Sequence, residues 1–234
     1  MSTVSRSIGY VLHARPYRET SQLLELFTVS EGRMAAVLRG ARNRGRHAAQ
    51  PFRRMELAWS GRGQVQTLTQ CDEIGAMRLK GDRAICGLYV NELAMKLLPR
   101  QIQAPDLFEA YEQVLCQLAD AGIPVERPLR QYELALLKWL GEGLEFLSSD
   151  DLEPEAHYLL EPQQTPRRAG AGEMDSPHCI TGRALTALLC GQLEDREDRR
   201  QARRVLHLLL DHHLDGKPLV SRQLIARGRS DATS

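Results

Sequence analysis

The sequence MELAWSGRGQVQTLTQC, residues 55–71, decides the fold of the N-terminal third of the chain. Its first six residues are mostly apolar and suit a β-strand. Gly61-Arg62-Gly63 then supplies a glycine-bracketed turn, and residues 65–71 follow with polar side chains interleaved among apolar ones. This pattern is typical of a β-hairpin, so the stretch predicts two strands joined by a tight turn.

Three more short runs with strand character precede the hairpin, at residues 7–13, 23–29 and 33–38. Ser30-Glu31-Gly32 marks a turn between the last two. Five short strands with tight turns within about 80 residues predict a small barrel or sandwich. A five-stranded OB barrel fits that count best, although periodicity alone does not separate it from an SH3-like barrel.

The apolar residues beyond residue 81 recur at helical spacing instead of alternating. Three amphipathic helices are expected before residue 148, and the second has Asp106 at its N-cap position. Two more are expected after residue 180, the first of them capped by Thr181. The expected helical ranges are 85–99, 107–118, 129–140, 181–193 and 196–214.

Residues 148–180 interrupt this helical pattern with prolines and glycines. We expect an irregular insertion there, carrying at most one strand at residues 157–160. The predicted fold class is therefore α+β, with a five-stranded OB-fold barrel followed by an α-helical domain. The expected division is a barrel at 1–80, a helical domain at 81–226 that contains the insertion, and a disordered tail at 227–234.

The charge of the chain is close to neutral overall but unevenly distributed. Residues 1–80 contain 13 lysines and arginines against 6 acidic residues, whereas residues 81–234 contain 18 against 24. Within residues 33–62, eight arginines accompany a single acidic residue, Glu56. Such asymmetry predicts a module that binds a polyanion, joined to a module of another kind.

The strongest local feature is the basic, glycine-containing segment RGARNRGRH, residues 39–47. Guanidinium groups present fork-shaped donors for phosphates, and glycines let backbone amides approach a ligand closely. A solvated loop that happens to be basic is the competing interpretation, but the concentration of arginines on a predicted barrel favours nucleic acid. The arginines expected to contact a DNA backbone are Arg33, Arg39, Arg42, Arg44, Arg46, Arg53 and Arg54.

Barrels that bind single strands usually add aromatic platforms on which bases stack. Aromatic residues make up 5% of this chain, so the aromatic signal is weak. Phe27 and Trp59 lie inside strand runs and are better explained as core residues. Tyr17 and Phe52 flank predicted loops and are the stacking candidates.

Catalytic motifs are not found in the sequence. Gly216-Lys217 is followed by proline, so it is not the phosphate-binding loop of an ATPase, and the G-x-S-x-G and H-E-x-x-H patterns do not occur. His207, Asp211 and His212 could ligate a metal from one helix, yet such residues on a leucine-rich helix normally form its polar face. We therefore predict a protein that is not an enzyme and uses no cofactor or metal.

Cysteine usage and apolar runs bear on the cellular compartment. The five cysteines are scattered and form no C-x-x-C pair, which argues against a disulfide framework or a zinc ribbon. No signal peptide is recognisable behind Met1, and no apolar run approaches the length of a membrane span. We therefore expect a cytoplasmic, nucleoid-associated protein without a membrane partner.

Several blocks along the chain resemble the RecO family of bacterial recombination mediators. The blocks occur in the family's order, and residues 148–180 are the part that fails to match. The matching blocks are VLHARPYRETS (11–21), LFT (26–28), GAR (40–42), QPF (50–52), YVNEL (89–93), LF (107–108), LRQYELALL (129–137) and GKPLVSR (216–222).

The resemblance implies an N-terminal OB fold, a helical C-terminal domain and no enzymatic turnover. Members of the family bind single- and double-stranded DNA and anneal complementary strands. With RecR they help to load RecA onto DNA coated by single-strand DNA-binding protein (SSB), whose acidic C-terminal tail they dock. Many members carry a four-cysteine zinc module, but this chain has no cysteine between Phe146 and Cys179, so it resembles the zinc-free branch.

A site for the SSB tail needs an apolar slot rimmed by arginine. The helix expected at 129–140 and the residues just before it offer Arg127, Arg130 and Tyr132 for this role, although core packing explains Tyr132 better. A competing function from another class is a protein-interaction adaptor whose barrel docks a protein partner instead of DNA. A metal-dependent nuclease is a third, and the sequence offers no organised carboxylate constellation for it.

Overall fold

A computed structural model of the chain describes residues 4–41, 49–61, 63–144 and 147–231, with side chains up to Ile225. The chain divides into two compact units. The first comprises Met1–Asp120 together with Leu219–Ser234, and the second comprises Ala121–Pro218. The barrel and the first two helices therefore share a compact unit, although the sequence places a boundary between them at residue 80.

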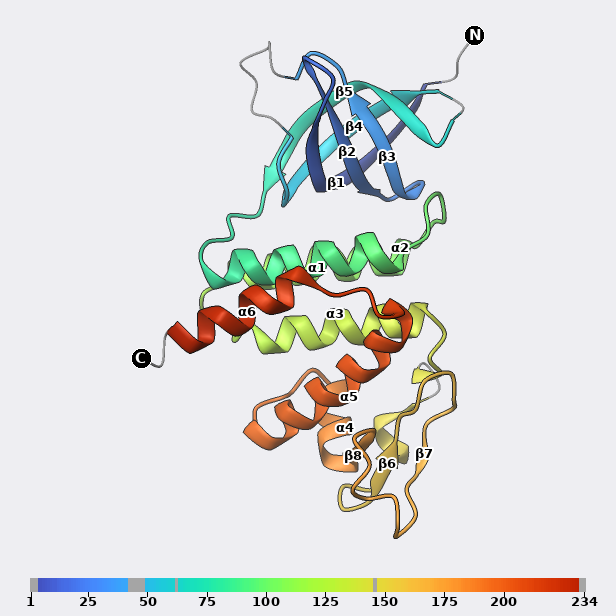
Figure 1. The fold of residues 1–234 in the computed structure, drawn as a ribbon. Helices are drawn as coiled ribbons and strands as arrows, with labels where there is room; N and C mark the ends of the chain where they lie inside the picture. The colour runs from blue at the N-terminus through green and yellow to red at the C-terminus, as the bar shows by residue number, and fades with distance from the viewer. Residues whose placement is uncertain (1–3, 42–48, 62, 145–146, 232–234) are drawn as a thin grey trace. The chain divides into compact units, whose positions relative to one another are not determined.

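Five strands form a closed barrel in the first unit, as the sequence predicts (Figure 1). The strands are β1 (Ser5–Tyr17), β2 (Ser21–Thr28), β3 (Gly32–Leu38), β4 (Arg53–Ser60) and β5 (Val65–Ala76). Their order around the barrel is β1-β2-β3-β5-β4, with β3 and β5 paired in parallel and the other neighbours antiparallel. This order is that of an OB fold, which decides between the two barrel types that the sequence left open.

The interior of the barrel is filled by the inward-facing side chains of its strands, because successive residues of a strand point to opposite faces. Trp59 belongs to this core and is 5% exposed, so its predicted core position is confirmed. Burial of each large apolar side chain contributes roughly 1.5–3 kcal/mol. The core residues are Val11, Leu24, Leu26, Met34, Ala36, Ala49, Met55, Leu57, Trp59 and Leu68.

A second core lies on the outer face of β1 and β2, where helix α2 (Pro105–Ala119) packs. The rings of Tyr10 and Phe27 contact those of Phe108 and Tyr111, with centroids 5.2 to 5.9 Å apart. Tilted and edge-on aromatic pairs of this kind add about 0.5–1.5 kcal/mol beyond their burial. Phe27 is fully buried here, which confirms its predicted core role.

The buried side-chain amide of Asn91 connects helix α1 (Asp82–Leu97) to strand β1 and helix α2. The side-chain nitrogen of Asn91 donates to the carbonyl of Leu12 at 2.9 Å, and its oxygen accepts from the hydroxyl of Tyr111 at 2.6 Å. A buried amide satisfied on both sides holds β1, α1 and α2 in one arrangement.

The turn between β2 and β3 also contacts the segment that links α1 to α2. Gly32 has a φ of +65°, and a Cβ added to it would lie 1.8 Å from the carbonyl oxygen of Ile102. Glycine is required at this position for both its left-handed backbone and its lack of a side chain.

The last helix, α6 (Val220–Asp231), returns to the first unit and packs against α1. The carboxylate of Glu92 accepts hydrogen bonds from the backbone N–H groups of Val220 and Ser221 and from the Ser221 hydroxyl. The guanidinium of Arg222 lies 5.8 Å from the ring centroid of Tyr89. These contacts fix the start of α6 on α1.

Helix α6 was not predicted from the sequence, whose expected helical ranges end at residue 214. Its backbone remains helical to Asp231, into the range where a disordered tail is expected from residue 227. The range from 227 to 231 contains no proline, and its two arginines favour a helix whereas Gly228 disfavours it. Residues 232–234 of the expected tail lie outside the described residues.

The second unit combines three helices with a small antiparallel sheet (Figure 1). Its elements are α3 (Glu126–Trp139), a 3-10 turn η2 (Ser149–Asp151), β6 (His157–Leu159), β7 (Arg167–Arg168), β8 (Cys179–Thr181), α4 (Gly182–Leu189) and α5 (Arg196–Leu214). The expected insertion therefore holds three strands, in the order β7-β6-β8, instead of at most one. The two additional strands have two and three residues, which is too short to leave a periodic pattern in the sequence.

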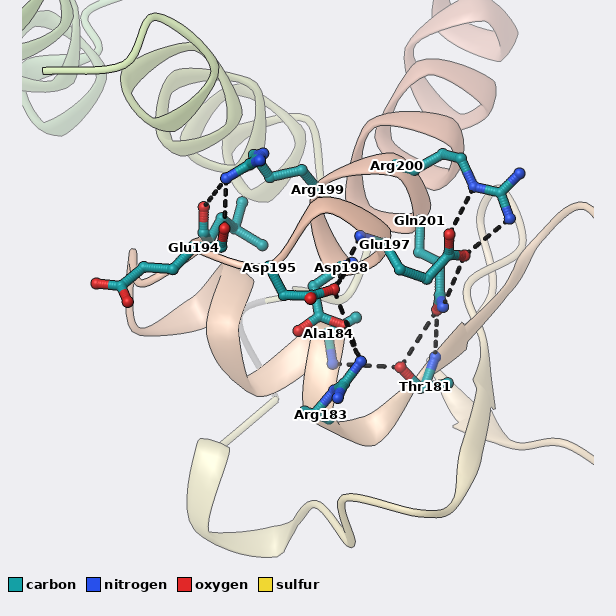
Figure 2. A network of polar contacts seen from close by, with 11 residues as sticks. Thr181, Arg183, Ala184, Glu194, Asp195, Glu197, Asp198, Arg199, Arg200 and Gln201 are labelled. Atoms are coloured by element: carbon teal, nitrogen blue, oxygen red, sulfur yellow. Dashed lines mark hydrogen bonds and ion pairs between the residues drawn. The ribbon is translucent and has the colours of Figure 1, made fainter.

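Helices α4 and α5 of the second unit begin at side-chain caps, as Figure 2 shows. The hydroxyl of Thr181 accepts from the backbone N–H of Ala184 and so confirms the predicted cap of α4. The carboxylate of Asp195 accepts from the N–H groups of Glu197 and Asp198 at the start of α5. These side chains satisfy backbone donors that the first turn of a helix leaves open.

The prediction that Asp106 caps α2 is wrong. The N-cap is Ala104, Pro105 is the first helical residue, and Asp106 lies inside the first turn. Proline suits the first helical position, because its fixed φ matches the helix and its missing N–H would have no partner there. The carboxylate of Asp106 is placed favourably for the helix dipole instead.

Candidate nucleic-acid interface

The arginines predicted to contact DNA fall into three groups in the structure. Arg42, Arg44 and Arg46 lie outside the described residues. Arg39, at the end of β3, and Arg53, at the start of β4, are on the side of the barrel where the chain runs from β3 to β4. Arg33 and Arg54 instead connect the barrel to the helices of the same unit.

Arg39 is the most accessible of the four arginines that are described. Its side chain is exposed, and it forms no hydrogen bond or ion pair with any described residue. Arg53 is also near the surface, but its guanidinium bonds the carboxylate of Glu73 at 2.6 Å and the side-chain oxygen of Gln50 at 3.2 Å. Such a pair between partly exposed side chains is weak, so a phosphate can compete for Arg53.

Arg33 is a structural residue in this fold. Its guanidinium pairs with Glu25 at 3.2 Å and donates to the carbonyls of Met95 and Leu98 at the end of α1. Its side chain is 17% exposed. Because these contacts use its N–H donors within the unit, few donors of Arg33 remain for a phosphate.

Arg54 is tied to α2 through Glu112. The Arg54 Nε–Glu112 Oε1 distance is 2.7 Å, and the same oxygen accepts from the hydroxyl of Tyr10 at 3.0 Å. The hydrogen bond with Glu112 raises the pKa of Arg54. Burial, followed by the charge of Glu112, raises the pKa of Tyr10.

The two stacking candidates differ in what their rings contact. Tyr17 ends β1 and is 36% exposed, and the guanidinium of Arg18 lies 5.3 Å from its ring centroid. Phe52 has a φ of +65° and turns its ring toward α1, where a Cβ added to Gly87 would lie 2.7 Å from the Phe52 Cε1. The ring of Tyr17 is therefore partly exposed at the surface, whereas the ring of Phe52 is used in packing.

A cavity of about 280 Å³ opens at the end of the barrel, beside Arg39. Sequence reasoning missed it, because its wall is assembled from three strands and from the segment that follows β3. The one available signal was the length of β5, whose polar second half continues beyond the barrel core. The lining residues are Leu38, Arg39, Ala41, Ala49, Met55, Leu68, Thr69, Gln70, Cys71 and Asp72.

The residues predicted to dock the SSB tail differ in their exposure to solvent. Arg127, in the first turn of α3, is exposed. Arg130 is 4% exposed and forms an ion pair with Glu133, and Tyr132 is 1% exposed. Burial raises the pKa of Tyr132. Arg130 and Tyr132 therefore belong to the interior, and Arg127 alone is accessible to a peptide.

A second cavity, of about 370 Å³, lies in the second unit between η2 and α4. Arg183 lines it, and its guanidinium bonds Asp198 at 2.9 Å and approaches Asp195 at 3.8 Å (Figure 2). This cavity was not predicted, since η2 and α4 are separated by the irregular segment. Its lining residues are Ser149, Leu152, Pro154, Arg183, Thr186, Ala187, Cys190 and Gln192.

The described residues bear on metal binding and on membrane insertion. No cluster of three or more His, Cys, Asp or Glu side chains able to hold a metal was found among them. None of the helices described is both long enough and apolar enough to cross a membrane.

Two family models together match nearly the whole chain. The model for the N-terminal part of Recombination protein O matches residues 1–77, and the model for its C-terminal part matches residues 78–223. The boundary between the two matches follows the end of β5.

Curated relatives agree with these matches. The chain is 40% identical over 225 residues to the DNA repair protein RecO of Methylococcus capsulatus, covering 92% of this chain and 90% of the relative. It is 38% identical to the protein of the same name from Yersinia pestis, covering 92% of each chain, and 35% identical to that of Cupriavidus metallidurans, covering 95% and 77%. The chain therefore belongs to the RecO family.

Proposed function

We propose that this protein is a non-catalytic mediator of DNA repair and homologous recombination that binds single- and double-stranded DNA and anneals complementary strands. The observation that carries the proposal is Arg39, an exposed arginine without a described partner at the open end of an OB barrel. It lies within a range of eight arginines and one acidic residue. The name of the relatives, DNA repair protein RecO, supports the same role.

Arg39 and Arg53 are the described residues that hold the DNA backbone in this proposal, with Tyr17 available to stack a base. Arg42, Arg44 and Arg46 carry the remaining charge of the segment between β3 and β4. Arg33 and Arg54 contribute indirectly, by attaching the barrel to α1 and α2. Loss of Arg33 weakens the fold before it weakens DNA binding, whereas Arg54 is 40% exposed and a phosphate can also compete for it.

Annealing needs no catalytic group. Two DNA strands repel each other through their phosphates, and a cationic surface lowers this repulsion by displacing counterions. Contacts to the backbone carry no sequence information, so the strands can shift past one another until their bases pair. A barrel with sequence-blind arginine contacts meets both requirements.

Salt dependence of oligonucleotide binding tests this function. Each phosphate contact that is lost lowers the slope of log K against log salt by about one unit for duplex DNA. We expect Arg39→Ala to weaken binding and to reduce the slope. Arg168→Ala, which removes an arginine from β7 in the second unit, is the control and should leave both unchanged. Equal behaviour of the two variants would contradict the proposal.

An adaptor that docks a protein on the barrel gives a different result in the same assay. Its affinity for DNA would be negligible at physiological salt, and complementary oligonucleotides would anneal no faster in its presence. Adding Mg²⁺ distinguishes a nuclease, since a nuclease would shorten the labelled strand. We expect faster annealing, with strands of unchanged length whether or not Mg²⁺ is present.

RecR and the C-terminal tail of SSB are the proposed protein partners, and loading of RecA onto SSB-coated DNA is the proposed outcome. The cavity between η2 and α4 supports the tail contact, because it joins apolar residues to Arg183, whose 60% exposed side chain can exchange its ion pairs with Asp195 and Asp198 for a peptide carboxylate. An acidic peptide that ends in apolar residues requires both features. Arg130 and Tyr132 meet this need less well, since they are buried.

Titration of a labelled tail peptide discriminates between the two locations. Ala187→Phe fills the cavity in the second unit and should abolish binding, whereas Arg127→Ala should reduce binding slightly or not at all. The reverse result would assign the tail to the start of α3.

A further inference from the structure

Strand β5 continues beyond the end of its pairing with β3. The parallel ladder ends at Val37 and Thr67, and β3 ends at Leu38, whereas β5 continues to Ala76 along β4. Beyond Thr67, β5 therefore has a strand neighbour on one side only among the described residues. Backbone N–H and C=O groups of alternate residues in an antiparallel strand point to opposite sides, so half of these groups face the open edge.

The cavity at the end of the barrel is located at this open edge. One wall consists of the β5 residues from Thr69 to Asp72, which offer backbone donors and acceptors. The cavity is also lined by apolar side chains of the barrel core, Met55 and Leu68, and by Leu38, which packs against that core. Arg39 contributes a cation to the same cavity.

These walls suit a flat ring whose faces are apolar and whose edge carries hydrogen-bond donors and acceptors. A nucleobase has this character, and its sugar-phosphate would leave the cavity beside Arg39. The volume of about 280 Å³ is just below the range of about 300–1,000 Å³ that is usual for pockets of drug-sized ligands. The cavity is therefore large enough for one base but too small for a larger cofactor.

We propose that this cavity binds a single unstacked nucleobase of the DNA strand held by the barrel. The proposal rests on the DNA binding proposed above and adds a base-binding site to it. A base in a single strand enters at little cost, whereas a base in a duplex must first be unpaired and unstacked at a cost of a few kcal/mol. The cavity therefore favours single strands, a preference that backbone contacts alone do not provide.

Cys71 provides a reporter, because its thiol belongs to the cavity wall. Burial, followed by the charge of Asp72, raises the pKa of Cys71 to about 11, so alkylation by iodoacetamide is best measured in mildly alkaline buffer. Cys116 and Cys190 are exposed and react in the same sample. Peptide mapping by mass spectrometry gives the alkylation rates of the three cysteines separately.

The experiment compares two oligonucleotides of equal length with the full-length protein, one with natural bases and one abasic throughout. Binding of each is first brought to saturation by fluorescence anisotropy. We expect the base-bearing strand to slow alkylation of Cys71 at least about fivefold, the lower end of what one bound base provides. The abasic strand should leave the rate unchanged, and Cys116 and Cys190 should react equally in both samples.

The outcomes separate this proposal from the one on which it rests. If neither strand binds, the DNA-binding function is wrong and the base site with it. If both bind and Cys71 remains reactive, or if both protect it equally, DNA binding stands and the base site is wrong. If an extended peptide protects Cys71 and the base-bearing strand does not, the open edge of β5 binds protein.

A filled cavity provides a second test. Ala49→Phe places a ring in the cavity, and Ala76→Phe adds the same ring at the exposed far end of β5. Wild-type protein should bind the base-bearing strand about tenfold more tightly than the abasic one. That ratio should fall to about one in Ala49→Phe and stay at the wild-type value in Ala76→Phe. A wild-type ratio in folded Ala49→Phe overturns the proposal.

Discussion

The carboxylate of Glu92 binds the start of α6 through three hydrogen bonds, two from the backbone and hydroxyl of Ser221 and one from the backbone of Val220. More than 120 residues separate these partners in the sequence. The carboxylate acts as an N-cap that is supplied by another helix, since it satisfies N–H donors that α6 leaves open. Glu92 also pairs with Lys96 one turn later in α1.

This contact predicts that α6 loosens in acid. Burial acts to raise the pKa of Glu92, but the hydrogen bonds from Ser221, Lys96 and Val220 outweigh it, and the pKa is lowered below its ordinary value. A lowered pKa in the folded state stabilises the protein above the pKa of the unfolded chain, and the stabilisation is lost as pH falls through the folded value. Amide hydrogen exchange should therefore show α6 opening below about pH 4.

Glu92→Gln tests the same contact at neutral pH. The amide retains one acceptor and loses the charge, so we expect α6 to be destabilised by on the order of 1 kcal/mol. The rate of amide hydrogen exchange in α6 should then change less between neutral and acidic pH than it does in the wild type. Glu109→Gln, an exposed change in α2, is the control and should leave exchange in α6 unaffected. Identical pH profiles for Glu92→Gln and wild type would contradict the role of Glu92.

Asn91→Ala should be among the most damaging changes in the first unit. It removes the donor to Leu12 and the acceptor for Tyr111, and each buried polar group left without a partner costs about 1–3 kcal/mol. We expect a loss of roughly 2–4 kcal/mol in urea unfolding. Tyr111→Phe removes a single hydroxyl and should cost less. A cost for Asn91→Ala below that of Tyr111→Phe would show that the amide does not link the three elements.

Gly32→Ala should destabilise the first unit far more than Gly81→Ala. Both glycines have positive φ, but a Cβ on Gly32 meets the Ile102 carbonyl at 1.8 Å, whereas a Cβ on Gly81 has nothing within 4 Å. Backbone strain costs about 1 kcal/mol at either site, and the collision adds to it at Gly32 alone. Thermal unfolding of the two variants compares them directly. Equal shifts in melting temperature would mean that the Gly32 turn does not touch Ile102 in solution.

Thr181→Ala should cost about 1 kcal/mol by removing the cap of α4. The Thr181 hydroxyl also contacts the side-chain oxygen of Gln201 at 3.2 Å, so part of the effect should reach α5 (Figure 2). Thr181→Ser keeps the hydroxyl and should retain most of the stability. Chemical unfolding of both variants measures the difference, and a similar loss in each would indicate that packing of the Thr181 methyl, not capping, is responsible.

The barrel and the helices up to α5 could be predicted from the sequence because their signals are local. Short apolar runs bounded by glycine-containing turns mark the barrel strands, and Thr181 caps α4 from a position next to it in the chain. The strands β7 and β8 escaped prediction since their pairing with β6 depends on residues far apart in the sequence.

The sequence predicted that the candidate site is basic, but it did not predict which arginines are exposed and which are paired. A count of arginines points to the segment between β3 and β4, but it cannot separate Arg39, which is exposed, from Arg54, which Glu112 engages across the fold. The same limit applies to Arg130, where surface position was expected and the ion pair with Glu133 lies in the interior. Pairing of this kind is decided by tertiary contacts that no linear pattern records.

The return of α6 to the first unit has a consequence for genetic dissection of the protein. A chain stopped after residue 218 keeps every element of the second unit and yet lacks a helix of the first. Truncations near the end of the gene should thus impair the barrel-bearing part of the molecule, and their phenotypes should resemble lesions at Glu92. An internal deletion of residues 121–218, closed by a flexible linker long enough to join Asp120 to Leu219, is the change that removes the second unit alone.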